Sequence, residues 1–324
     1  MRYRQKILRL ITLTGFVYCG FGSGFGFAYL PETGHQPLST IALKYYNECI
    51  NLNPNWQLKT ISANNARDIL QHNHNEDRAV SRMPIRLVNW HFFNDGFQSR
   101  RLAVFNILDK SMTRLVRHIG KNLVKDGLSQ EELNKQTGRM LHFMEDSTVP
   151  AHATPVWHGP GVSDPFDSIP VSNSVDALVK IEINTICDSA DNSFNKYEIK
   201  GEKLTRQEAE LLQIIADTSN QTLDLIKETA CITSKGKAFS WDVFWTPPAK
   251  IDESLKIFGE DYFGEYGADA FPTNEAISIG EPLDQCTITE NKLSEFIHTL
   301  HVNAVKADIR ALYWINKQVF VKDH

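Results

Sequence analysis

Helical periodicity is the feature that most limits what this chain can fold into. Apolar residues return every three or four positions over long stretches, and the strict alternation typical of strands is scarce. Two helices open with a capping box, in which a hydroxyl residue is followed three positions later by glutamate. The predicted helices cover 39–50, 100–127, the segment after the Ser129–Glu132 capping box, 208–230 after the Thr205–Glu208 capping box, and 291–319. We therefore expect a mainly α protein, a multi-helix bundle with long loops.

Two segments interrupt this pattern. Residues 151–170 are rich in Gly, Pro and Ser and are expected to form a loop. Residues 235–287 are rich in aromatic residues, Gly and Pro, which indicates long loops or a small irregular subdomain, whose rings we expect to contact a membrane surface. The expected organisation is a signal peptide over 1–28, a helical zinc-binding catalytic domain over 29–234, and a segment over 235–324 packed on the same domain.

The N-terminal segment has the composition of a secretory signal peptide. Arg2, Arg4, Lys6 and Arg9 precede or enter an apolar run, and small residues favour cleavage after Ala28, with a cut a few residues earlier as the alternative. Glycines interrupt the run, so a permanent membrane span is not expected. The sequence therefore predicts a secreted protein, either extracellular or periplasmic.

Charge argues against one class of partner. The segment 1–28 carries four basic residues and no acidic one, so its removal changes the formal charge from −5 to −9. An acidic chain does not attract a polyanion by bulk electrostatics, and no extended nucleic acid is expected as a partner.

Four cysteines follow the predicted cleavage point: Cys49, Cys187, Cys231 and Cys286. An even number in an exported protein indicates two disulfides, with three pairings open. Buried free thiols are the alternative.

Histidines and acidic residues have a spacing that suits a metal site. On a helix, His142 and Asp146 project from the same face, and Pro150 can turn His152 toward the same region. Imidazole nitrogen and carboxylate oxygen are zinc ligands. Taken alone, this spacing is also that of an ordinary surface pair or a hydrogen bond.

Three further residues extend the pattern upstream. His35 stands at the start of a predicted helix. Asp77 comes before His91 in the sequence, and His91 is the one that lies within an aromatic cluster. The order His, Asp, His, then His-x-x-x-Asp-x-x-x-x-x-His over 29–167 resembles that of the bacterial trinuclear zinc phospholipases C. More distantly, it is similar to that of the fungal single-strand-specific nucleases that share their fold.

The resemblance implies up to three Zn²⁺ ions within the helical bundle. One would take Asp77, His91, His142 and Asp146, with Asp146 bridging to a second ion. The second would take His35 with the terminal amine and carbonyl of the mature chain, here of Tyr29, where the family commonly has Trp. The third would take His152 with His158 and either Asp164 or Asp167.

The resemblance also implies roles in catalysis. Zinc polarises phosphoryl oxygens and lowers the pKa of bound water to about 7. Asp77 is the candidate general base, with Glu76 as the alternate if the register slips by one. Four aromatic residues are candidates for holding a choline headgroup through cation–π contacts, with plain core packing as the alternative; they are Trp90, Phe92, Phe93 and Trp157.

The expected activity is that of a secreted zinc metallophospholipase C. It would hydrolyse phosphatidylcholine-like phospholipids at a membrane surface, as a monomer, to diacylglycerol and a phosphorylated headgroup. A zinc-dependent single-strand nuclease, or another phosphodiesterase, would need the same ligands. An exported binding protein without enzymatic activity is the less favoured alternative.

Overall fold

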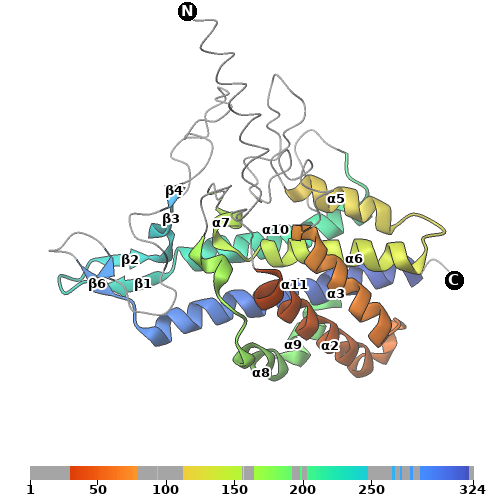
Figure 1. Ribbon diagram of the computed structural model, residues 1–324, viewed down its shortest axis with the longest axis horizontal. Helices are drawn as coiled ribbons and strands as arrows, with labels where there is room; N and C mark the ends of the chain where they lie inside the picture. Colours follow the sequence, from red (N-terminus) through yellow and green to blue (C-terminus); the bar gives the residue numbers. More distant parts are fainter. Residues whose placement is uncertain are drawn as a thin grey trace, which may run out of the picture.

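A computed structural model of the chain is mainly helical, as the periodicity predicts (Figure 1). It describes residues 30–78, 93, 112–154, 156, 164–191, 198, 203–246, 265–266, 271, 278–279 and 285–320. The main helices are α2 (Gln36–Leu52), α3 (Ala63–Arg78), α5 (Met112–Leu123), α6 (Gln130–Asp146), α8 (Asn173–Ile181), α9 (Ile183–Asp191), α10 (Arg206–Ile226) and α11 (Glu290–Phe320). Short helical turns are η1 (Pro31–His35), η2 (Pro54–Trp56), α7 (Pro150–Ala153), η5 (Pro165–Ser168) and η6 (Trp241–Val243).

The helix starts predicted from capping boxes are confirmed. The backbone N–H of Glu132 donates to Ser129 Oγ at the start of α6 (3.2 Å). At the start of α10 both bonds of the box form, from Glu208 N to Thr205 Oγ1 and from Thr205 N to Glu208 Oε2. Of the helix expected over 100–127, the structure describes α5, and residues 100–111 lie outside the described part.

The long helix α11 is the element that most other helices share. It contacts α2, α6, α8, α9 and α10, and Figure 1 shows it running along the long axis of the view. Leu300, Ala304, Ala307 and Ala311 are buried at intervals of three and four residues, which places them on one face. Small alanines on that face let neighbouring helices approach closely.

The helices α3 and α6 pack against each other through a glycine. A Cβ atom at Gly138 would lie 2.3 Å from the carbonyl oxygen of Ile69 and 2.8 Å from the backbone nitrogen of Asn73. Both neighbours are backbone atoms of α3, so they cannot give way as a flexible side chain would. Gly138 therefore permits the close approach that brings the C-terminal half of α3 beside the C-terminal half of α6.

The described strands are short and form three two-stranded antiparallel sheets. They are β1 (Thr229–Ile232) with β2 (Ala238–Ser240), β3 (Trp245–Thr246) with β4 (Glu265–Tyr266), and β5 (Ser278–Ile279) with β6 (Cys286–Thr287). In Figure 1, β1, β2 and β6 gather at one end of the molecule. The β1–β2 hairpin spans the expected division between 234 and 235.

Aromatic residues of the irregular segment form part of the core. Trp241, Phe244, Trp245 and Phe271 are at most 4% exposed, and the ring of Trp241 stacks on that of Phe296 in α11 with centroids 4.1 Å apart. The expectation that this segment presents its rings to a membrane is wrong for these four residues, because their apolar surface is already covered by one another and by α11.

Two disulfides are present, as the cysteine count predicts. Cys49 of α2 pairs with Cys187 of α9, and Cys231 of β1 pairs with Cys286 of β6. Disulfides are typical of proteins that reside in an oxidising environment.

Among the described helices, none combines the length and the apolar character needed to cross a bilayer.

Candidate metal centre

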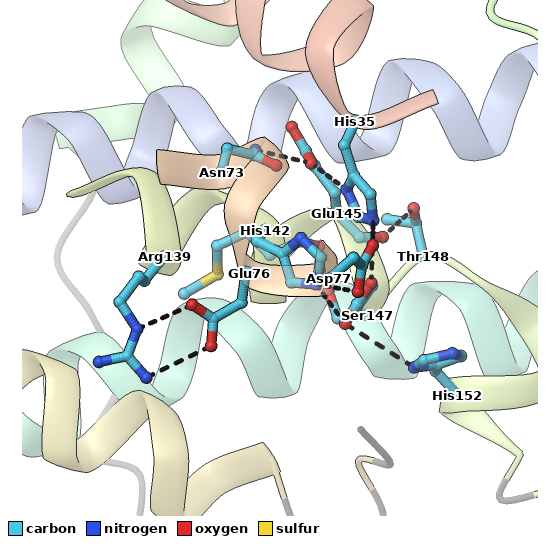
Figure 2. A network of polar contacts seen from close by, with 12 residues as sticks. His35, Asn73, Glu76, Asp77, Arg139, His142, Glu145, Ser147, Thr148 and His152 are labelled. Carbon is cyan, nitrogen blue, oxygen red and sulfur yellow. Dashed lines mark hydrogen bonds and ion pairs between the residues drawn. The ribbon is translucent and has the colours of Figure 1, made fainter. Parts of the chain in front are cut away.

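His35, Asp77 and His142 come from three separate elements and meet in the interior (Figure 2). His35 ends the turn η1 and begins α2, Asp77 lies near the end of α3, and His142 lies in α6. Each offers one ligand atom, these atoms lie within 4.8 Å of one another, and all three residues are buried. This group could hold a metal ion.

Asp146, the last residue of α6, joins the group. His35 Nε2 lies 3.7 Å from Asp77 Oδ2 and 3.5 Å from Asp146 Oδ1. His142 Nε2 lies 3.4 Å from Asp77 Oδ1 and 3.5 Å from Asp146 Oδ2. Each carboxylate thus turns one oxygen toward each imidazole.

These separations suit an ion better than direct hydrogen bonds. Hydrogen bonds from nitrogen to oxygen are usually about 2.7–3.2 Å long. Ligand atoms about 2.0–2.1 Å from a tetrahedral Zn²⁺ ion are about 3.4 Å apart. Taken pair by pair, each nitrogen–oxygen separation of 3.4–3.7 Å is close to that distance, and the two imidazoles face different oxygens of each carboxylate.

The protonation of the two imidazoles differs. Burial lowers the pKa of His142 despite the nearby carboxylates of Asp146 and Asp77, so its ring is neutral at neutral pH, the form that binds metals. Burial also acts to lower the pKa of His35, but Glu145, Asp146 and Asp77 outweigh it and raise the pKa to about 8.

A layer of polar residues lies behind His35. Its Nδ1 atom makes a short contact with Glu145 Oε2. Ser39 Oγ donates to Glu145 Oε1 (2.5 Å), and Asn73 Nδ2 donates to Glu145 Oε2 (3.0 Å). Asp308 of α11 lies beside Glu145, and burial together with Glu145 raises the pKa of Asp308 well above its usual range.

Sequence reasoning missed this layer. Ser39, Asn73, Glu145 and Asp308 are fully buried, yet each stands in an amphipathic helix among other polar residues. The one available signal was at Glu145, which stands directly before Asp146 and follows the apolar Phe143 and Met144 in sequence.

His152 lies beside Asp146 as well. After α6 ends, Pro150 begins the short helix α7, and His152 is buried with its Nδ1 4.0 Å from Asp146 Oδ2. The backbone N–H of Phe93 donates to the carbonyl oxygen of His152 (2.9 Å), and Phe93 is 1% exposed in the core.

The two aspartates proposed for the third ion have different surroundings. Asp164 uses both oxygens in the fold: Oδ1 accepts from Phe166 N (2.9 Å) and Oδ2 from Trp245 Nε1 (2.7 Å). The carboxyl oxygens of Asp167 accept no hydrogen bond from the described residues. The backbone oxygen of Asp167 accepts from Leu30 N (3.0 Å), which holds η5 beside η1.

The carboxyl group of Asp167 is also influenced by the aspartates of the candidate metal group. Burial first, and then Asp164, Asp146 and Asp77, raise the pKa of Asp167 well above its usual range. Buried carboxylates that repel one another in this way would be stabilised by a divalent cation, because its charge offsets theirs.

Glu76, the alternate to Asp77, points elsewhere. Arg139 binds it through two contacts, Nε to Oε2 (2.9 Å) and Nη2 to Oε1 (3.3 Å), and Figure 2 shows this pair beside the imidazole group rather than within it. Of the two neighbouring acids, Asp77 is the one that faces the imidazoles.

Six of the expected site residues lie outside the described part of the chain: Tyr29, Trp90, His91, Phe92, Trp157 and His158. The arrangement of three ions therefore stays a prediction. No family model, curated protein or solved structure matches this chain.

Proposed function

We propose that this chain is a zinc-dependent phosphodiesterase that acts as a phospholipase C on phosphatidylcholine-like lipids. The observation that supports the proposal is the spacing of the buried imidazole nitrogens and aspartate oxygens, 3.4–3.7 Å. A mixed set of imidazole and carboxylate ligands favours zinc, whereas calcium and magnesium favour sets made of oxygen alone.

Each residue has a part in this proposal. His35 and His142 would hold zinc through Nε2, Asp146 would contribute its oxygens, and Asp77 would contribute one oxygen and keep the other free. His152 would hold a further ion near Asp146. Zinc held there would supply polarisation of the phosphoryl oxygens and water activated at neutral pH.

Asp77 is the proposed general base. Its carboxylate would accept the proton of the attacking water at the oxygen that does not bind zinc. Burial of the ligands keeps bulk water from the inner side of the site, which strengthens the electrostatic attraction between the site and a phosphate diester. As the water oxygen bonds to phosphorus, the bond from phosphorus to the diacylglycerol oxygen would break, and that oxygen would take up the proton from Asp77 to leave as diacylglycerol.

The remaining expectations belong to the same proposal. Two disulfides support export to an oxidising compartment, in line with a secreted protein. The acidic balance of the chain favours a lipid substrate at a membrane surface over an extended nucleic acid. We propose that the protein works as a monomer.

The proposal is tested by parallel assays on one zinc-loaded preparation. Release of phosphocholine from phosphatidylcholine vesicles and cleavage of single-stranded DNA are measured before and after chelation, together with metal content. We expect lipid hydrolysis that chelation abolishes and added zinc restores. His142→Ala should lose it, whereas His118→Ala, at an exposed position of α5, should keep it.

Two results would contradict the proposal. Cleavage of DNA without lipid hydrolysis would make the protein a nuclease. Tight zinc binding without hydrolysis of either substrate would make it a binding protein.

A further inference from the structure

A carboxylate lies behind His35, at the ring nitrogen opposite the one that faces the aspartates. His35 Nε2 is 3.5 Å from Asp146 Oδ1, while Nδ1 contacts Glu145 Oε2. A neutral imidazole has a proton on one ring nitrogen and a lone pair on the other. A hydrogen-bond acceptor beside one nitrogen keeps the proton there, so the lone pair is on the other nitrogen. The carboxylate of Glu145 accepts a hydrogen bond from Nδ1–H of His35, which leaves the lone pair of the ring on Nε2.

Glu145 is itself held by two donors. Ser39 Oγ donates to Oε1 (2.5 Å) and Asn73 Nδ2 donates to Oε2 (3.0 Å), while the same Asn73 nitrogen donates to Ser39 Oγ (2.7 Å). All three residues are fully buried. A carboxylate fixed by buried donors can hold an imidazole in one orientation, since water does not compete for its oxygens.

The three residues also tie together the three elements that carry the ligands. Ser39 follows His35 by one helical turn at the start of α2, and Asn73 precedes Asp77 by one turn on α3. Glu145 stands next to Asp146 on α6. The network thus couples the placement of His35 to that of both aspartates, as Figure 2 shows for Asn73, Glu145 and His35.

We infer that Glu145 is a positioning residue, which fixes the tautomer and ring orientation of His35 so that Nε2 can bind the metal ion. The inference rests on the metal centre of the proposed function and adds a residue to it. A carboxylate behind a ligating histidine also makes the imidazole a stronger ligand. Loss of such a partner typically lowers metal affinity about 10–100-fold.

The chain offers a matched control in Glu76. Glu76 precedes Asp77 as Glu145 precedes Asp146, and both glutamates are buried. Glu76 binds Arg139, whereas Glu145 binds His35. Removing the charge of either glutamate leaves an altered buried contact, and of these two described contacts the one at Glu145 is made with a proposed ligand.

The experiment compares Glu145→Gln with Glu76→Gln. Zinc affinity is measured by competition with a chromophoric chelator, and we expect about a 10–100-fold loss for Glu145→Gln. Glu76→Gln should lower the melting temperature and leave zinc affinity unchanged. Ser39→Ala, which removes one donor to Glu145, should weaken zinc binding less than Glu145→Gln and serves if that variant does not fold.

A spectroscopic signature separates positioning from general destabilisation. In zinc-loaded protein labelled with ¹⁵N-histidine, the Nδ1–H resonance of His35 is assigned by its absence in His35→Ala. It should shift in Glu145→Gln and stay in place in Glu76→Gln. Wild-type zinc affinity and an unshifted resonance in Glu145→Gln would overturn the inference.

The inference and the proposed function fail in different ways. Zinc binding by the wild type without phosphodiester hydrolysis contradicts the function and leaves the role of Glu145 standing. Hydrolysis with zinc affinity insensitive to Glu145 and Ser39 contradicts the role of Glu145 alone. A wild type that binds no zinc would overturn both.

Discussion

The imidazole ring of His35 stacks on that of His142, with centroids 4.1 Å apart and planes inclined by 26°. The stacking turns both Nε2 atoms toward the carboxylates of Asp77 and Asp146. Each carboxylate faces both rings, so the four side chains form one unit. A change in one of them is therefore expected to affect ion binding by the others.

Zinc should stabilise the folded protein through this unit. At free zinc about 100-fold above the dissociation constant, the free energy of unfolding should rise by about 2.7 kcal/mol. His35→Ala and His142→Ala should each remove most of that gain. The double variant should lose little more than either single one, because the two rings share their partners. Thermal unfolding during a zinc titration measures this, and a full gain in the double variant would contradict it.

Gly138→Ala should destabilise the protein and weaken zinc binding. The new Cβ would meet the carbonyl oxygen of Ile69 at 2.3 Å, so α3 and α6 must move apart, at a cost of about 1–3 kcal/mol. Asp77 and His142 lie on these two helices and would separate as well. Urea denaturation and a zinc titration test both effects.

Gly127→Ala is the control for that variant. Gly127 has a φ of +72° and open space around the position of a Cβ, so alanine there strains only the local backbone. We expect a loss of about 1 kcal/mol without a change in zinc affinity. Equal zinc affinity in wild type and Gly138→Ala would show that the helix contact does not position the ligands.

Asp167 gives the metal-free protein a distinctive pH dependence. Burial and the nearby aspartates raise the pKa of Asp167, so the folded state binds a proton more tightly than the unfolded state. Its contribution to stability is therefore complete below the unfolded pKa of 3.8 and is lost as pH rises toward the folded pKa. Asp167→Asn should lessen this fall in chelator-treated protein, as measured by denaturation across pH.

Asp164→Asn is the control, because it changes the same segment and leaves the titrating carboxyl group of Asp167 in place. Its two oxygens hold Phe166 N and Trp245 Nε1, so the variant should lose about 1–3 kcal/mol of stability. The fall with rising pH should persist in this variant. If the loss of stability with rising pH were smaller in Asp164→Asn and unchanged in Asp167→Asn, Asp164 rather than Asp167 would be the group responsible.

The two disulfides should differ in their effect on stability. Replacing both cysteines of a bridge by alanine should cost about 2–5 kcal/mol. The Cys49–Cys187 bridge spans 138 residues and the Cys231–Cys286 bridge 55, so the first should stabilise by about 0.8 kcal/mol more in the chain-entropy description. Non-reducing peptide mapping checks the pairing, and denaturation of the two double variants checks the order.

Glu208 should stabilise the protein at neutral pH and not in strong acid. Burial opposes its ionisation, but contacts with Arg117, Thr205 and Lys121 outweigh it and lower the pKa of Glu208 to about 2. A lowered folded pKa gives stability that is present above the unfolded value of 4.5 and lost as pH falls toward 2. Glu208→Gln should cost about 2 kcal/mol at pH 7 and less than about 0.5 kcal/mol at pH 2.

Glu210→Gln is the control on the same helix. Glu210 pairs with Arg206, whose side chain is 90% exposed, and such surface pairs contribute less than about 1 kcal/mol. A difference between wild type and Glu208→Gln that persists at pH 2 would show that packing, rather than charge, is responsible.

Local pattern was enough to predict the mainly α fold. Hydrophobic periodicity and capping depend on residues within one or two turns, and both predicted capping positions, at Ser129 and Thr205, begin helices in the structure. The cysteine count likewise predicted two disulfides. The pairing stayed open, because it depends on which helices and strands lie side by side.

The sequence by itself determined which side chains could bind a metal, since imidazole and carboxylate chemistry belongs to the residue and the His142–Asp146 spacing to the helix. Only the tertiary structure decided that Asp77, rather than Glu76, faces His35 and His142. It also decided that Glu145 stands behind His35. Both outcomes depend on how α2, α3 and α6 pack, and packing brings together donors that are far apart along the chain.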